Sequence, residues 1–76
     1  MKTKNVDAMD IEKGTVVVLG DQEWTVVNMS PDLPKKKRHG DTYLTFDLER
    51  VLGGETEHLT YGTHGDVSMI IALDNS

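Results

Sequence analysis

Apolar and polar residues alternate with a period of two along much of this chain, and no long stretch shows the period of a helix. Leu44, Phe46 and Leu48 share one phase of residues 42–50, and polar side chains occupy most of the other phase. A second alternating run lies near the end, at residues 67–73. Alternation of this kind is typical of strands that bury one face. The pattern therefore predicts an all-β chain.

Turn signals divide the chain into five predicted strands. Glycine followed by an acidic residue occurs four times, and each pair comes directly before a β-branched or alternating run. Such pairs are typical of tight turns, because glycine adopts positive φ freely and Asp bonds to nearby backbone. The predicted strands are residues 15–19, 22–29, 42–50, 55–61 and 67–73, with 55–61 expected at an edge. The side chains predicted to be buried are Val16, Val18, Val26, Leu44, Phe46, Leu48, Met69 and Ile71.

Five short strands joined by tight turns favour a small five-stranded barrel of the SH3-like type. An antiparallel sheet of this size has to curl on itself to bury one face and to protect its edges. The OB-fold is the alternative, but its usual helix between the third and fourth strands has no counterpart here. We expect residues 1–10 to form an N-terminal arm and residues 11–74 to form the barrel.

Composition narrows the class of protein. The chain has 76 residues, which suits one domain, and it has no cysteine for a disulfide or a thiolate metal site. The net charge of −5 argues against a protein that coats nucleic acid over its whole surface. No apolar run is long enough to cross a bilayer, so we expect no membrane partner and a cytoplasmic location.

Half of the basic residues stand side by side in one predicted loop. These are Lys35, Lys36, Lys37 and Arg38, which follow Pro34. The rest of the chain has four basic residues and thirteen carboxylates, so its net charge is −9. Four adjacent cations repel one another unless water or an anionic partner screens them. We expect the run to be exposed and mobile, as a solvated turn or as a phosphate contact.

Three stretches resemble the N-terminal KOW-like barrel of bacterial elongation factor P. They are residues 11–18, residues 23–27 with Trp24 before a valine strand, and residues 42–57, and the resemblance spans residues 11–70. The family places a lysine at the tip of a long hairpin, where it approaches transfer RNA, and Lys36 is the closest counterpart. The family's glycine beside that lysine is missing here, so the resemblance implies the barrel fold and not a translation-factor role.

Aromatic residues add one candidate to the nucleic-acid hypothesis. Barrels that bind nucleic acid stack bases on exposed aromatic rings, at about 1–3 kcal/mol per base. Phe46 shares the phase of the predicted core, and Trp24 is expected in the core as well. Tyr43 lies on the opposite phase, just after the basic run. The predicted nucleic-acid surface is therefore Lys35, Lys36, Lys37, Arg38 and Tyr43.

Chemistry beyond binding has little support in this sequence. It has no nucleophile elbow, no glycine-rich phosphate loop and no His-Glu-x-x-His helix, so we expect no enzyme, no metal and no cofactor. The acidity outside the basic run instead favours a protein partner with a basic surface, with RNA or DNA as the alternative. Such a module would suit an inhibitor or a phage-type accessory protein, either as a monomer or as an edge-paired dimer. The predicted protein-binding residues are Asp47, Glu49, Glu55 and Glu57.

Overall fold

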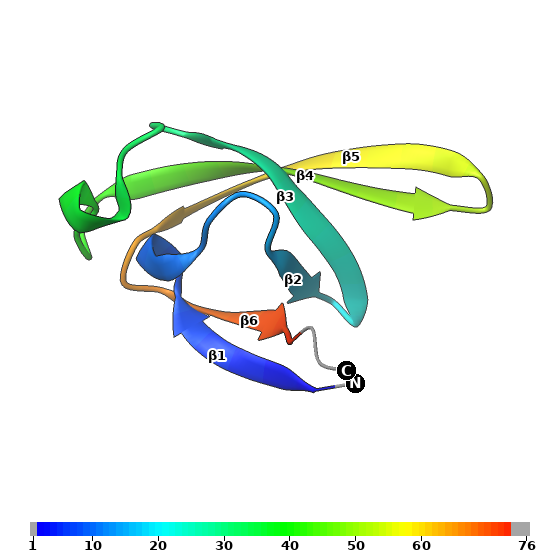
Figure 1. Ribbon diagram of the computed structural model, residues 1–76, viewed down its shortest axis with the longest axis horizontal. Helices are drawn as coiled ribbons and strands as arrows, with labels where there is room; N and C mark the ends of the chain where they lie inside the picture. The colour runs from blue at the N-terminus through cyan, green and yellow to red at the C-terminus, as the bar shows by residue number, and fades with distance from the viewer. Residues whose placement is uncertain (1, 74–76) are drawn as a thin grey trace.

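A computed structural model describes residues 2–73, which form one six-stranded antiparallel sheet (Figure 1). The predicted all-β class is confirmed, although the sheet is open. The strands occur in the order β1-β6-β2-β3-β4-β5. Their bounds are β1 (Thr3–Asp7), β2 (Val16–Leu19), β3 (Gln22–Ser30), β4 (Tyr43–Leu52), β5 (Glu55–His64) and β6 (Ser68–Ala72), with 3₁₀ turns η1 (Ala8–Asp10) and η2 (Lys35–Lys37). Between residues 2 and 73 there is no helix of the length and apolar character that a membrane span requires.

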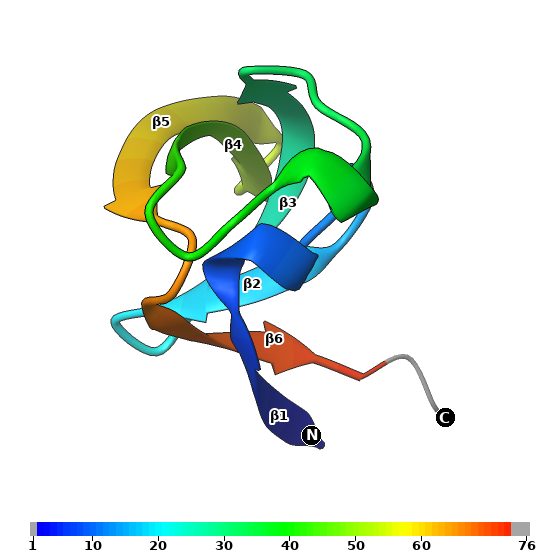
Figure 2. The same cartoon turned by 90° about the vertical axis from the view of Figure 1, so that its left-hand side faces the viewer.

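The sheet coils strongly, and its two ends are the edge strands β1 and β5 (Figure 2). All five predicted strands are present with similar bounds. The strand β1 was not predicted, because residues 1–10 were expected to form an arm. It pairs with β6, and Val6 lies opposite Met69 in that pairing. The chain thus extends its sheet by one strand at the N-terminal side.

The core lies on the concave face of the coiled sheet. The predicted burial of Leu44, Phe46, Leu48, Val26 and Met69 is confirmed. The largest side chains with less than 2% exposure are Phe46, Ile11, Leu44, Leu48, Val17 and Val26. Burying one such apolar side chain contributes about 1.5–3 kcal/mol. These residues therefore supply most of the apolar stabilisation of a small domain.

The predicted phase of β2 was wrong. Val17 is fully buried, whereas Val16 and Val18 are half-buried. Val17 lies directly opposite the buried Trp24 on β3, and directly opposite residues of a strand pair share a face of the sheet. Three successive valines offer no alternation from which the inward residue could be chosen. Ile71, also predicted to be buried, is half-buried.

A β-bulge interrupts the pairing of β3 with β4. The register shifts between Val26 and Asn28, so Val27 is the extra residue, and it is 43% exposed. The bulge places Met29 in the core, three residues after Val26 rather than two. Beyond this point β3 bends across the core, so it pairs with β4 at one end and β2 at the other.

The hairpin of β4 and β5 extends past the core at one end of the molecule (Figure 1). Val51 is 69% exposed and Leu52 is 56% exposed near its turn, which Gly53 and Gly54 form with φ of 61° and 81°. Two successive residues with positive φ make a type I′ turn, and its twist matches the twist of the flanking strands. The hairpin end is therefore well defined although it contacts little of the core.

Candidate binding surfaces

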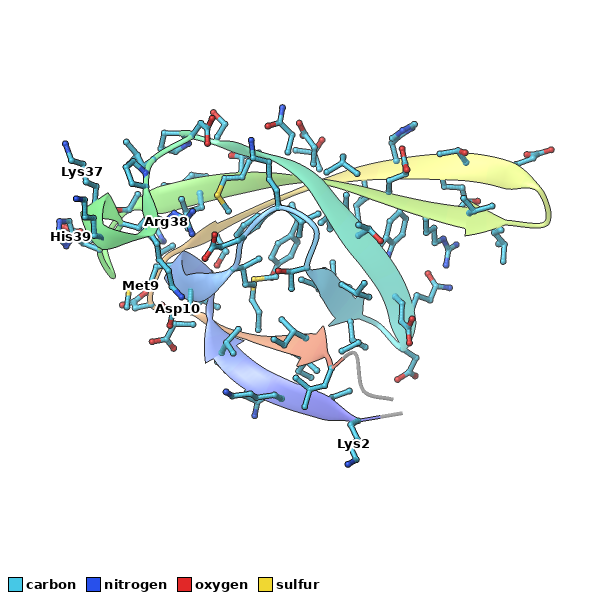
Figure 3. All side chains as sticks on the ribbon, in the orientation of Figure 1. Lys2, Met9, Asp10, Lys37, Arg38 and His39 are labelled. Atoms are coloured by element: carbon cyan, nitrogen blue, oxygen red, sulfur yellow. The ribbon has the colours of Figure 1, made fainter. Side chains whose placement is uncertain are left out.

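The basic run lies at the end of the molecule opposite the β4–β5 turn (Figure 3). Lys35, Lys36 and Lys37 form η2 and are exposed, as predicted. The Lys35 Nζ lies 3.9 Å from a carboxylate oxygen of Glu12, and the side chains of both residues are more than half exposed. Exposed pairs of this kind contribute little to stability. The nearby carboxylate does, however, reduce the positive charge that the turn presents.

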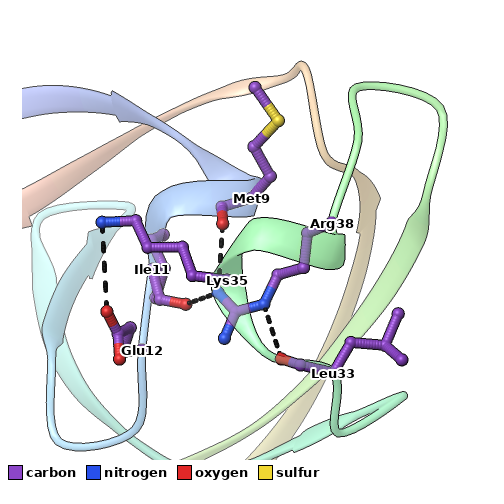
Figure 4. A network of polar contacts seen from close by, with 6 residues as sticks. All are labelled: Met9, Ile11, Glu12, Leu33, Lys35 and Arg38. Carbon is purple, nitrogen blue, oxygen red and sulfur yellow. Dashed lines mark hydrogen bonds and ion pairs between the residues drawn. The ribbon is translucent and has the colours of Figure 1, made fainter.

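Arg38 does not belong to the exposed run, which corrects the prediction made for it. Its Nε donates a hydrogen bond to the Leu33 carbonyl at 3.1 Å. One terminal nitrogen donates to the carbonyls of Met9, at 3.0 Å, and Ile11, at 2.7 Å (Figure 4). The guanidinium group can satisfy three carbonyls because its donors are fixed in a planar fork. Arg38 therefore connects the loop before β4 to η1, and its guanidinium group is used for hydrogen bonds within the fold.

Tyr43 is exposed, as predicted, and it lies at the start of β4 near the same end. Its side chain is 56% exposed and its ring lies over Gly62 on β5. The ring also meets His64 edge-on, with 5.1 Å between centroids and an angle of 79° between planes. Packing of an aromatic ring over a strand glycine covers backbone that would otherwise be open to water.

The two His-Gly-Asp tripeptides at residues 39–41 and 64–66 come together in space. The Gly65 N–H donates to the Thr42 carbonyl at 2.8 Å, and the Asp66 N–H donates to the Gly40 carbonyl at 3.0 Å. These backbone bonds hold the β5–β6 connection against the start of β4. Within residues 2–73 no group of three His, Cys, Asp or Glu side chains is arranged to hold a metal ion.

The four predicted protein-binding carboxylates do not share one surface. Asp47 and Glu49 point to the outer face of β4, since they lie on the phase opposite Phe46. Glu55 and Glu57 point to the other face of the hairpin. Glu57 lies opposite Arg50 and accepts a hydrogen bond from its Nε at 2.7 Å. Of the four, Glu49 lines a depression between the β2–β3 and β4–β5 hairpins.

That depression, which we call the acidic groove, has a volume of about 480 Å³. It lies where the β2–β3 hairpin and the β4–β5 hairpin diverge. Three of its lining residues, Val16, Thr25 and Glu49, lie directly opposite one another on three adjacent strands. Its lining residues are Val16, Asp21, Gln22, Glu23, Thr25, Glu49, Arg50, Val51 and Leu52.

The charge of the acidic groove comes from three carboxylates and one guanidinium group. Arg50 is already engaged, because Glu57 binds its Nε and its guanidinium carbon lies 4.8 Å from the centre of the Trp24 ring. Asp21 and Glu23 have no ion pair within the part of the chain that the structure describes, and Glu49 lies 3.2 Å from the His58 Nε2. The acidic groove therefore offers carboxylates beside exposed apolar side chains.

A second groove adjoins the acidic groove. Its volume is about 610 Å³, and it shares Val16 and Glu23 with the acidic groove. Its remaining lining residues are Gly14, Thr15, Ile71, Ala72 and Leu73, none of which carries a charge. The two grooves are therefore neighbours that meet at Val16 and Glu23.

Sequence reasoning missed Asp21, Glu23 and the apolar residues of the acidic groove. Asp21 was interpreted only as a turn residue, and its φ of 66° agrees with that role. The sequence does contain a signal for this site, because acidic residues cluster near two hairpin turns. The strand order then makes those two hairpins neighbours. No known family model matches this sequence, and no curated protein is found to be similar to it. The likeness to the elongation factor P barrel thus rests on the residues alone.

Proposed function

We propose that this protein is a small non-enzymatic binding module, built as an SH3-like barrel, that holds a basic segment of a partner protein in the acidic groove. The observation that carries the proposal is the arrangement of Asp21, Glu23 and Glu49 around a groove whose one cation, Arg50, is already paired. The exposed Val51, which lies on the same face of β4 as Glu49, would contact apolar side chains of the partner. Binding sites commonly combine apolar area with a few polar groups that fix orientation.

The barrel assignment is supported by the arrangement of the strands. Five of the six strands lie where alternation and turn signals predicted them, and the open sheet coils around a single apolar core. The acidity of the chain would suit a role as an inhibitor or a phage-type accessory protein in the cytoplasm. A basic surface on the target protein would attract the acidic chain. Opposite charge at an interface increases the rate of association and selects among partners.

The alternative is binding of RNA or DNA at the basic turn with Tyr43. The exposed lysines and the 56% exposure of Tyr43 at the same end favour it. Against it, Arg38 is bound to three carbonyls, and a carboxylate of Glu12 lies beside Lys35. That leaves Lys36 and Lys37 as the cations of the run that have no ion pair within residues 2–73.

Titration with a peptide of alternating Lys and Val residues tests the proposal, with a Glu and Val peptide as the negative control. Trp24 is the one tryptophan of the chain and does not line the acidic groove, but it contacts Arg50, which does, so its fluorescence reports on binding through Arg50. The double variant Glu23→Gln, Glu49→Gln should weaken binding about tenfold, since an exposed charge pair contributes up to about 1 kcal/mol.

Matched variants outside the acidic groove show whether the effect belongs to that site. Asp7→Asn, Asp66→Asn changes the net charge by the same amount and should leave the affinity unchanged. Equal losses in the two double variants would mean that only net charge matters, and the proposal would then fail. Binding of single-stranded RNA that is lost in Lys36→Ser, Lys37→Ser would establish the nucleic-acid alternative in its place.

A further inference from the structure

The strand β5 forms an open edge of the sheet. It runs for ten residues, and no strand between residues 2 and 73 pairs with it on the side away from β4. Residues 55–60 are all exposed. A strand of this length at an edge presents a row of unpaired N–H and C=O groups to a further strand.

The hairpin register shows which residues present those groups. In a two-residue type I′ hairpin the residues that flank the turn, here Leu52 and Glu55, are hydrogen-bonded to each other. Hydrogen-bonded and non-bonded pairs alternate along an antiparallel ladder. The N–H and C=O groups of every second residue therefore point away from β4. These residues are Thr56, His58, Thr60, Gly62 and His64, of which the His64 carbonyl already accepts from the Val67 N–H.

The two edges of the sheet differ in how they are protected. Proteins limit pairing at an edge with short strands, lysines, prolines or bulges. The opposite edge, β1, has only five residues and contains Lys4. In contrast, β5 contains neither lysine nor proline, its carboxylates Glu55 and Glu57 lie only in its first three residues, and its pairing with β4 shows no register shift. Leu59 also leaves 40% of its surface exposed on this strand.

We propose that two copies of this chain pair antiparallel along β5, with the two-fold axis at Thr60. Thr60 then lies opposite its own counterpart, and His58 lies opposite Gly62 of the second copy. On the other face Leu59 meets Tyr61, and Glu57 meets Thr63. These pairs would form about six backbone hydrogen bonds around the axis.

A second copy fits this edge because the pairing brings no two carboxylates opposite each other and covers an apolar side chain. In this register neither Glu55 nor Glu57 lies opposite another carboxylate, and each copy covers the exposed Leu59 of the other. A two-fold contact is also closed, because it uses the β5 edge of both copies. The acidic grooves remain outside the contact, so the dimer would present two of them. The inference does not depend on what the acidic groove binds.

Sedimentation equilibrium tests the dimer directly, and the expected mass at micromolar to millimolar concentrations is twice the chain's 8.5 kDa. Thr60→Pro removes an N–H that points away from β4, so it should yield a monomer with the circular dichroism of the wild type. Thr60→Lys should also yield a monomer, since two lysines would meet at the axis, and it guards against misfolding of the proline variant. A monomeric wild type at 0.5 mM, or a dimer that persists in Thr60→Lys, would overturn the proposal.

Cysteine cross-linking tests the register, because the chain contains no cysteine of its own. Residues of a hydrogen-bonded pair lie about 5.5 Å apart at Cα, which is within the range that a disulfide bridges. Thr60→Cys should therefore form a disulfide-linked dimer on mild oxidation. The control Lys4→Cys, on the opposite edge, should remain a free thiol under the same conditions. Equal cross-linking of both variants would contradict the proposed register.

Discussion

Replacement of Arg38 by serine should destabilise the fold, although Arg38 belongs to a run of basic residues that appears uniform in sequence. The change removes the N–H groups that donate hydrogen bonds to the carbonyls of Leu33, Met9 and Ile11. Ile11 is only 1% exposed. A hydrogen bond to a charged group contributes about 1.5–3 kcal/mol. The contributions of neighbouring bonds do not add, and water can reach this half-buried site. We therefore expect a total loss of about 2 kcal/mol.

Urea denaturation followed by Trp24 fluorescence measures this loss. With a slope of about 1 kcal/mol per molar urea for a small domain, the midpoint should fall by about 2 M. Lys36→Ser is the matched control, since the Lys36 side chain is exposed and makes no ion pair within residues 2–73, and the midpoint of this variant should equal that of the wild type. Equal midpoints for the two variants would refute the role assigned to Arg38.

Four further substitutions test the packing. Phe46→Ala should cost about 3–5 kcal/mol in urea denaturation, because it leaves a cavity in the core where Phe46 has 0% exposure; a loss under 1 kcal/mol would mean that the ring faces solvent. Gly65→Ala should cost about 1–3 kcal/mol by overpacking, since the added Cβ would overlap the His39 carbonyl oxygen. Gly62→Ala should cost less, because its Cβ would meet the Tyr43 ring, which can move. Arg50→Ala should shift the Trp24 emission to longer wavelength by uncovering the ring, and an unchanged spectrum would contradict the stacking.

Local patterns were sufficient to predict most of the strands. Leu44, Phe46 and Leu48 alternate with polar residues, so their shared face could be determined from the sequence alone, and all three are fully buried. The valine run of β2 lacks that alternation, and its phase depends on the residue that Val17 faces across the sheet. The strand β1 is short and polar, and it is recognisable only through its pairing with β6.

The binding surfaces depend on contacts that are distant in sequence. Arg38 bonds to a carbonyl 29 residues away, so its neighbours in the chain give no sign of its role. The acidic groove forms because β3 leaves β4 near Thr25 and continues with β2, while β4 continues with β5. The acidity of the chain follows from its composition, whereas the strand order determines which carboxylates line the acidic groove.

Amide chemical-shift mapping during titration with the Lys and Val peptide tests the proposed function most directly. The proposal predicts that the largest shifts occur at Val16, Glu23, Glu49 and Val51, and that they vanish in the Glu23→Gln, Glu49→Gln variant. Addition of single-stranded RNA should leave the amides of Lys36 and Lys37 unchanged. Peptide shifts spread evenly over the surface, or RNA shifts confined to the basic turn, would contradict the acidic groove as the binding site.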